Sequence, residues 1–113
     1  MARFLIIGAT SGIGQSVKQA LLQMGHEVIT TARNDSKMKP DYICDASDFS
    51  AVEQVFASVG DIDGVVNCAG SLLLKPAHTT SFEEYQAVIN QSLTTAFAVV
   101  RAAGLHMKNG GSV

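Results

Sequence analysis

The sequence is poor in residues that are typical of several protein classes, and these shortages exclude some of those classes. It contains no tryptophan, two prolines and two cysteines in 113 residues. Two cysteines are too few for a disulfide framework or a zinc site, so we interpret Cys44 and Cys68 as free thiols in a reducing compartment. No apolar run is long enough to span a bilayer, and no secretory leader is recognisable. We therefore expect a cytoplasmic protein without a membrane partner.

Charge of either sign is also scarce. Charged residues make up 16% of the sequence, the formal net charge is −2, and no basic run occurs. Nucleic-acid binding needs a basic face, so we expect no nucleic-acid partner. The hydrophobic content of 47% favours a packed globule, and the length suits one small domain covering residues 1–113.

Apolar runs alternate along the chain with segments of helical period. This alternation is typical of an α/β fold, a doubly wound parallel sheet with helices on both faces in three α/β/α layers. The polar stretch 34–40 is interpreted as a loop or one helical turn. The last residues, 110–113, are interpreted as a turn and the first residue of a fifth strand, which indicates the N-terminal portion of a longer protein. Strands are expected at 3–7, 26–32, 42–44 and around 65–66, and helices at 13–24, 48–59 and 81–107.

The third helix carries two further signals. Ser81 and Glu84 form a capping-box pattern at its start. Residues 96–107 are apolar nearly all round, which predicts burial on two sides. One side should meet the sheet, and the other a partner subunit or further chain.

A glycine-rich turn between the first strand and the first helix is the most informative feature. Gly8, Gly12 and Gly14 follow the spacing G-x-x-x-G-x-G. The N–H groups of such a turn and the dipole of the helix that follows bind a pyrophosphate, and Thr10 and Ser11 add hydroxyl donors. This turn predicts a dinucleotide site; the alternative is a plain tight turn.

The end of the second strand bears on which dinucleotide is bound. An acidic residue here would hold the ribose hydroxyls of NAD, but the sequence has Arg33 and Asn34. The planar guanidinium suits a 2′-phosphate, so NADP is favoured over NAD. Lys37 and Lys39 can assist. The alternative is a solvated surface arginine with lysines that serve solubility.

Two further strand ends carry candidate residues. Asp45 follows the third strand, where it can accept a hydrogen bond from an adenine amino group or simply form part of a turn or helix cap. The segment Asn67-Cys68-Ala69-Gly70 ends the fourth strand, and its small residues allow a cofactor close to the backbone.

Together these motifs resemble the short-chain dehydrogenase/reductase family. The segment 8–14 is similar to its cofactor turn, residues 67–70 resemble its Asn-Asn-Ala-Gly motif, and Asp45 falls where its adenine-contacting Asp lies. The resemblance covers the whole chain. It implies a Rossmann fold with strand order 3-2-1-4-5-6-7 and hydride transfer between NAD(P) and a carbonyl or alcohol. The expected cofactor-binding residues are Gly8, Thr10, Ser11, Gly12, Ile13, Gly14, Arg33, Asn34, Asp45, Ala46, Asn67, Ala69 and Gly70.

The family's catalytic machinery is not found in these 113 residues. Its Ser and Tyr-x-x-x-Lys follow the fifth strand, and neither Tyr42 nor Tyr85 is followed four residues later by Lys. No catalytic or metal-ligating residue is therefore assigned, and we expect the chain alone to show no turnover. The alternative function is a non-catalytic NAD(P)-binding module or a truncated form that lacks the active site.

The third helix also departs from the family pattern. Aligning Leu93 with the Leu of the family's Val-Asn-Leu-x-Gly puts Ser92 at the Asn and Thr95 at the Gly, and Asn90 is out of register for an α-helix. The family Asn supports a water in the proton relay, so Ser92 puts that relay in doubt. In the family this long helix commonly forms a dimer interface, which makes helix 81–107 the candidate surface for a homo-oligomer.

Overall fold

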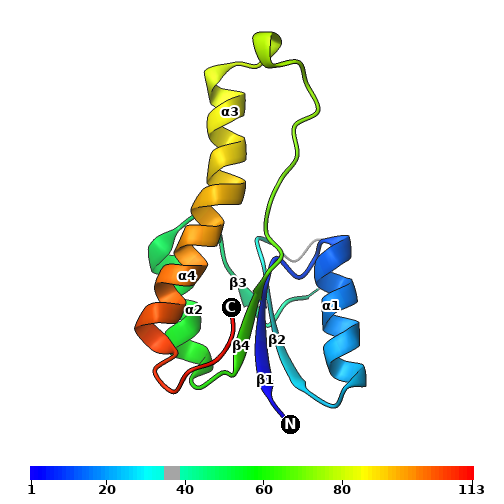
Figure 1. Ribbon diagram of the computed structural model, residues 1–113, viewed down its shortest axis with the longest axis vertical. Helices are drawn as coiled ribbons and strands as arrows, with labels where there is room; N and C mark the ends of the chain where they lie inside the picture. Colours follow the sequence, from blue (N-terminus) through cyan, green and yellow to red (C-terminus); the bar gives the residue numbers. More distant parts are fainter. Residues whose placement is uncertain (35–38) are drawn as a thin grey trace.

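The fold is a parallel sheet between two layers of helices, as the sequence predicts (Figure 1). The computed structural model describes residues 1–34 and 39–113, so part of the expected loop 34–40, including Lys37, lies outside the described residues. The strand order is β3-β2-β1-β4, the first four positions of the order that the resemblance implies. The strands are β1 (Arg3–Ile7), β2 (Glu27–Ala32), β3 (Tyr42–Ile43) and β4 (Gly64–Asn67).

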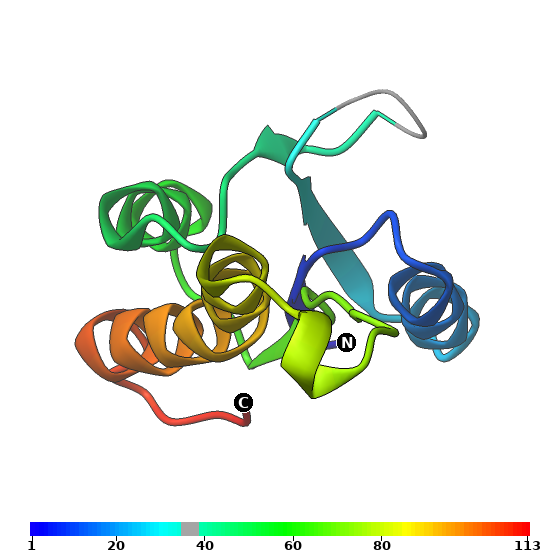
Figure 2. The same ribbon diagram turned by 90° about the horizontal axis from the view of Figure 1, so that it is seen from above.

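The helices divide between the two faces of the sheet (Figures 1 and 2). Helix α1 (Gly12–Gln23) covers one face, and α2 (Phe49–Val59) lies beside α4 (Thr95–His106) on the other. The expected helix 81–107 is present as α3 (Phe82–Ile89), a π-helical turn labelled η2 (Asn90–Thr94) and α4. Before α3 comes the short 3₁₀ helix η1 (Ala77–Thr79).

The main core lies between the sheet and the α2/α4 layer. The predicted stripe on α2 is buried, with Phe56 2% exposed. It packs with Leu5 and Ile7 of β1 and with Val99 of α4. Burying each such side chain contributes about 1.5–3 kcal/mol. This packing holds β1 and β4 firmly against the helices.

The helix ends follow the sequence signals. Asp48 caps α2 through Oδ1, which accepts from the N–H groups of Ser50 and Ala51. The capping box of Ser81 and Glu84 forms as predicted. These caps satisfy N–H groups that have no partner within the helix.

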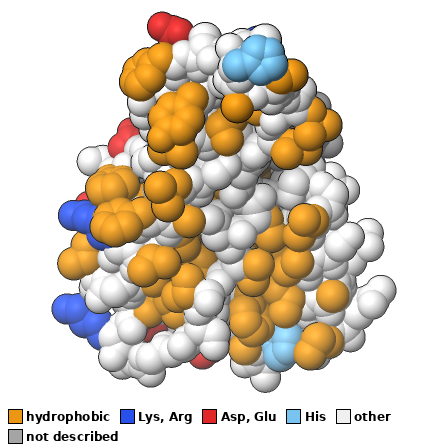
Figure 3. All heavy atoms as spheres, turned by 45° about the horizontal axis from the view of Figure 1, so that its top comes forward, with side chains coloured by type: hydrophobic (Ala, Val, Ile, Leu, Met, Phe, Trp, Pro, Cys, Tyr) orange, Lys and Arg blue, Asp and Glu red, His pale blue; other side chains and the backbone are white. Residues whose placement is uncertain are grey.

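Helix α4 is buried on one side in the single chain, the side expected to meet the sheet. Ala98, Val99 and Ala102 are buried, but Phe97 and Val100 are each 59% exposed. Hydrophobic side chains accordingly lie on the outer surface of the helix tract (Figure 3). The sheet and α2 pack against only one side of α4, so the apolar outer side is left to solvent in the single chain.

Residues 71–89, here named the arm, rise above the sheet (Figure 1). They comprise the chain after β4, then η1 and α3. Lys75 in the arm pairs with both carboxylate oxygens of Glu84, at 2.8 and 3.0 Å. The arm lengthens the molecule to 49 Å against 28 and 22 Å in the other directions.

The expected start of a fifth strand is present as one bridge. Gly64 pairs in parallel with Ser112, and the N–H of Val65 donates to the Ser112 carbonyl at 2.9 Å. Residues near the C-terminus therefore run beside the start of β4.

Candidate functional site

A cavity of about 460 Å³ opens at the carboxyl ends of the strands. Ligands bind at this edge in open parallel sheets, because the loops after the strands converge there. Segments far apart in the sequence form its walls, namely the glycine turn, the ends of β2, β3 and β4, and the helix tract around η2. The residues that line it are Ile7, Gly8, Thr10, Ser11, Arg33, Cys44, Asp45, Ala46, Ser47, Cys68, Ala69, Gly70, Ala87, Asn90, Gln91 and Thr95.

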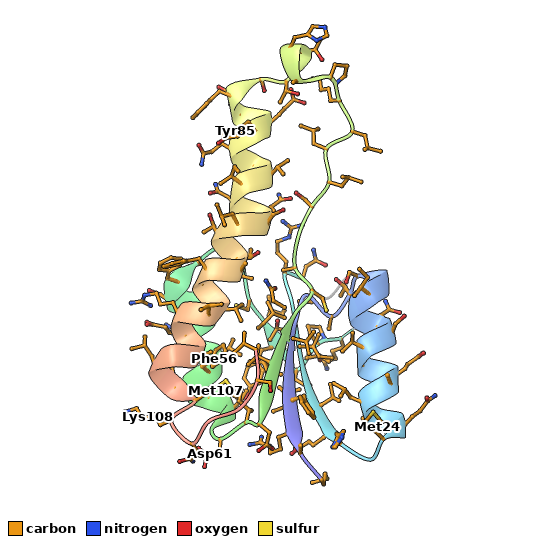
Figure 4. The ribbon with its side chains drawn as sticks, viewed as in Figure 1. Met24, Phe56, Asp61, Tyr85, Met107 and Lys108 are labelled. Carbon is orange, nitrogen blue, oxygen red and sulfur yellow. The ribbon has the colours of Figure 1, made fainter. Side chains whose placement is uncertain are left out.

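A second hollow, of about 230 Å³, lies near the opposite end of the sheet. Asp61, Met107 and Lys108 are among its lining residues (Figure 4). No group of three potential metal-ligating side chains occurs among residues 1–34 and 39–113. Eight of the thirteen sequence-predicted cofactor residues line the larger cavity, namely Gly8, Thr10, Ser11, Arg33, Asp45, Ala46, Ala69 and Gly70, whereas Gly12, Ile13, Gly14, Asn34 and Asn67 do not.

The glycine turn is packed too closely for side chains at two of its positions. Gly8 has φ +79°, and a Cβ there would lie 2.7 Å from the Ala69 nitrogen. A Cβ on Gly14 would lie 2.5 Å from the Gly8 carbonyl oxygen. At Gly12 an added Cβ meets no atom within 4 Å. The turn thus brings bare backbone to the cavity edge and leaves Gly12 open to an approaching group.

The N-terminus of α1 combines this turn with an uncompensated dipole. Ser11 caps the helix, its Oγ accepting from the Gly14 N–H at 2.9 Å. The first turn of α1 holds no acidic residue, whereas Asp48 caps α2 and two Glu occupy the first turn of α3. The positive end of the α1 dipole is therefore available to an anion. Ile13 does not line the cavity, and its side chain is 72% exposed.

The β2 and β3 ends supply one charge of each sign. Arg33 and Asp45 both line the cavity and are exposed. Hydrogen bonds from the Ser47 side chain and backbone, together with the charge of Arg33, lower the pKa of Asp45 below its usual value. Asn34 and Lys39 are exposed but are not among the lining residues. This part of the cavity therefore presents a cation and an ionised acceptor.

The β4 end is shaped by a side chain that lies behind the cavity wall. Asn67 Oδ1 accepts from the Ala69 N–H at 3.1 Å, and the Cys68 N–H donates to the Ile7 carbonyl at 2.7 Å. Ala69 and Gly70 then line the cavity, whereas Asn67 does not. Asn67 thus sets the course of the chain.

Both cysteines are free thiols, as predicted, and both line the cavity. Burial, with the charges of Asp45 and Asp48, raises the pKa of Cys44 to about 11. Burial also raises the pKa of Cys68. Neither thiol is activated as a nucleophile, because the thiolate is the reactive form.

The π turn adds residues that sequence reasoning missed. Asn90, Gln91 and Thr95 line the cavity. The Thr95 Oγ1 donates to the carbonyls of Gln91 and Ser92, both at 3.0 Å. The prediction that Asn90 is out of register assumed α-helical geometry, whereas the structure has a π turn over Asn90–Thr94. Ser92 instead hydrogen-bonds the backbone of Ser71.

Ser47 was also missed, although a local signal was present. It follows Asp45 by two residues, the spacing at which an Asp side chain accepts from the backbone in a turn. In the structure it makes this contact and lines the cavity.

Comparison with known families decides the classification. Residues 8–113 match the family model described as Enoyl-(Acyl carrier protein) reductase. The chain belongs to the short-chain dehydrogenase/reductase family. The resemblance seen in the glycine turn and in residues 67–70 is thereby confirmed. Family members similar to this chain are named as oxidoreductases, and two of them illustrate the range.

The NADP-dependent 3-hydroxy acid dehydrogenase YdfG of Escherichia coli is 30% identical, with 96% of this chain aligned to 51% of that protein. The 3-oxoacyl-[acyl-carrier-protein] reductase MabA of Mycobacterium bovis is 32% identical, with 92% of this chain aligned to 44% of that protein. The chain thus spans about half the length of these short-chain dehydrogenase/reductase relatives.

Solved structures of other proteins share the fold. A short chain dehydrogenase from Mycobacterium smegmatis superposes with a TM-score of 0.85 at 22% identity, covering 96% of this chain and 52% of that one. Aldohexose dehydrogenase from Thermoplasma acidophilum gives a TM-score of 0.84 at 23% identity, covering 94% and 44%. In the part of the chain that the structure describes, no helix has the length and apolar character to cross a membrane.

Proposed function

We propose that the cavity binds NADP(H), and that the chain is the cofactor-binding part of an oxidoreductase acting on a carbonyl or alcohol. The observation that carries the proposal is the cradle at Gly8 and Gly14, where added Cβ atoms would lie 2.7 and 2.5 Å from backbone atoms. It borders a cavity of about 460 Å³, within the range of small-molecule sites. The bound cofactor would supply or accept the hydride.

The pyrophosphate and the adenine base of the dinucleotide each have matching groups in the chain. The glycine turn and the α1 N-terminus suit the pyrophosphate, with Thr10 and Ser11 as hydroxyl donors. Asp45 suits the adenine amino group, and the bare backbone at Ala69 allows close approach. The proposed cofactor site consists of Gly8, Thr10, Ser11, Gly12, Ile13, Gly14, Arg33, Asn34, Asp45, Ala46, Asn67, Ala69 and Gly70.

The preference for NADP rests on the charge at the end of β2. Arg33 is exposed and lines the cavity. A guanidinium there attracts a 2′-phosphate, whereas a carboxylate would repel it. The relative YdfG is named as NADP-dependent, which supports the same choice.

The test is a fluorescence titration of the chain with NADPH and NADH. We expect NADPH to bind more tightly, and Arg33→Ala to weaken NADPH at least about tenfold, the value of one charge-assisted contact. NADH affinity should stay unchanged. Lys108→Ala is the matched control, because this exposed cation lies at the second hollow, near the opposite end of the sheet. Equal affinities for both dinucleotides, before and after mutation, would contradict the proposal.

A non-catalytic NADP-binding module is the second candidate. It is favoured by one observation, that neither Tyr42 nor Tyr85 is followed four residues later by Lys. Tyr85 also lies on the arm, well above the sheet (Figure 4). The chain would then hold the dinucleotide without an acid for the developing alkoxide.

Self-association through the helix tract is part of the proposal. Leu93, Phe97 and Val100 lie exposed along η2 and α4, and Phe97 stacks on Phe49 of α2. A second copy would cover this apolar surface. Light scattering after size-exclusion chromatography tests it. A dimer that Val100→Glu converts to monomer is expected, and a wild-type monomer at all concentrations would contradict it.

A further inference from the structure

The turn between β3 and α2 forms one wall of the cavity. Its backbone is closed by a hydrogen bond from the Asp48 N–H to the Asp45 carbonyl at 3.0 Å. Ala46 is buried in the main core and fixes the turn from below. Asp45 and Ser47, on either side of Ala46, both line the cavity. The fold therefore presents these two polar side chains together at one place.

Ser47 holds one oxygen of the Asp45 carboxylate with two donors. The Ser47 N–H donates to Oδ1 at 3.0 Å, and the Ser47 hydroxyl donates to the same oxygen at 2.7 Å. Among the described residues, no hydrogen bond from the protein reaches Oδ2. One oxygen is thus fixed by Ser47, and the other remains able to accept from a molecule in the cavity.

We propose that Ser47 is a positioning residue that makes the site selective for an adenine base. This inference rests on the proposed function, since it concerns the base end of the bound NADP(H). An ionised carboxylate has acceptors only. It pairs with the 6-amino group of adenine, which donates, and opposes the 6-oxo group of hypoxanthine, which accepts. The orientation of Asp45, set by Ser47, then determines which base is retained.

The Ser47 hydroxyl contributes to this selectivity in two ways. It holds the rotation of the carboxylate through its hydrogen bond to Oδ1. It is also the largest influence that lowers the pKa of Asp45, which keeps the carboxylate ionised and therefore unable to donate. Without the hydroxyl, the Ser47 N–H alone would hold the carboxylate less firmly.

The experiment compares two dinucleotides that differ only at the base, NADPH and reduced nicotinamide hypoxanthine dinucleotide phosphate. Their affinities for the full chain are measured by calorimetric titration at pH 7. Wild type should prefer NADPH by about tenfold or more, as expected where a carboxylate contact is replaced by an opposed acceptor. Ser47→Ala should reduce this preference at least about threefold, by weakening NADPH alone. Asp45→Asn should abolish it, because an amide can also donate.

Two variants separate positioning from general damage to the turn. Ser47→Thr keeps a hydroxyl donor and should retain the wild-type preference. Ser50→Ala removes an exposed hydroxyl that takes part in none of the described hydrogen bonds, and it should also leave the preference unchanged. Thermal melts monitored by circular dichroism confirm that each variant is folded.

The inference is overturned if Ser47→Ala weakens both dinucleotides by the same factor, because that is the result of a merely structural role. It is also overturned if wild type binds both bases equally well. If wild type binds neither dinucleotide, the proposed function itself fails, and the inference fails with it. The failure of the inference and that of the proposed function thus give different results.

Discussion

At the scale of single residues, the site depends on positions where the backbones of two segments are in direct contact. Gly8 takes φ +79°, in the left-handed region, and lies against the chain at Ala69. Residues with a Cβ pay a steric penalty in that region. Close contact at this position is what allows the β1 and β4 ends to form a single surface. Glycine is therefore required at position 8 by packing within the protein, in addition to any requirement set by a ligand.

Substitution of Gly8 by alanine tests this contact. The new Cβ would lie 2.7 Å from the Ala69 nitrogen, so we expect a loss of at least about 2 kcal/mol in the free energy of unfolding. Gly12→Ala is the stability control, since its Cβ meets no atom within 4 Å. Urea denaturation measures both. Equal stabilities of the two variants would contradict the packing described.

The lowered pKa of Glu84, in the arm, predicts that the stability of the fold depends on pH. Hydrogen bonds from Lys75 and from the Ser81 backbone hold the pKa of Glu84 at about 2, against an ordinary value of 4.5. A lowered pKa in the folded state means that the ionised carboxylate stabilises the fold above about pH 4.5. This contribution is lost as the pH falls toward 2.

The check is a series of thermal melts between pH 6 and pH 3. Wild type should be more stable than Glu84→Gln at pH 6, and the difference should shrink as the pH falls. A difference that stays constant over this range would show that the carboxylate contributes nothing through its charge.

At the scale of elements, local patterns predicted the helices well, and contacts between elements were harder to predict. The stripe on α2 and the caps at Asp48 and Ser81 depend on neighbours three or four residues away, so the sequence alone reveals them. The π turn at Asn90–Thr94 interrupts that periodicity, and nothing in the local pattern signals it. Its consequence, that Asn90 and Gln91 line the cavity, was missed for this reason.

The exposed side of α4 illustrates a second limit of prediction from sequence. Its apolar residues predicted burial, but a periodic pattern does not say which surface provides the cover. The cysteines were likewise harder to assign, because their place at the cavity depends on segments that meet only in the folded chain. Ser47 had a local signal, its position two residues after Asp45, but its place at the cavity also depends on the fold. The glycine turn was predictable because its requirements are local.

Helix α4 also offers a simple test of helix propensity. Gly104 lies inside the helix, is exposed, and has no atom within 4 Å of an added Cβ. Gly104→Ala should therefore raise the free energy of unfolding by about 0.5–1 kcal/mol. Gly111→Ala should instead lower it, because φ is +144° and the Cβ would lie 2.6 Å from the Asp63 carbonyl oxygen. Chemical denaturation distinguishes the two, and destabilisation by Gly104→Ala would contradict this account.

At the scale of the whole molecule, the cavity brings together segments that are far apart in the sequence. The glycine turn, the β3–α2 turn, the β4 end and the π turn each supply lining residues. A ligand in the cavity would contact all of them together. Any molecule that binds only the folded state stabilises the entire fold by mass action.

NADPH should therefore raise the melting temperature of the chain. At about 100 times its Kd the stabilisation is about 2.7 kcal/mol, which corresponds to a shift on the order of 10 °C for a domain of this size. NADPH absorbance should not fall when a carbonyl substrate is added, since the chain has no Tyr-x-x-x-Lys. An unchanged melting temperature would contradict binding, and steady oxidation of NADPH would contradict the lack of turnover.

The single bridge between Gly64 and Ser112 has a consequence for the solvent exchange of amide protons. Ser112 accepts from the Val65 N–H, and alternation along a strand directs the Asn67 N–H toward the same side of β4. Deuterium should then replace the amide proton of Asn67 quickly and that of Val65 slowly, although the two residues are only two positions apart on β4. Beyond Val65, no hydrogen bond between described residues pairs the backbone groups on this edge of β4. Another strand can add there, and a bound strand would be detected as slowed exchange at Asn67.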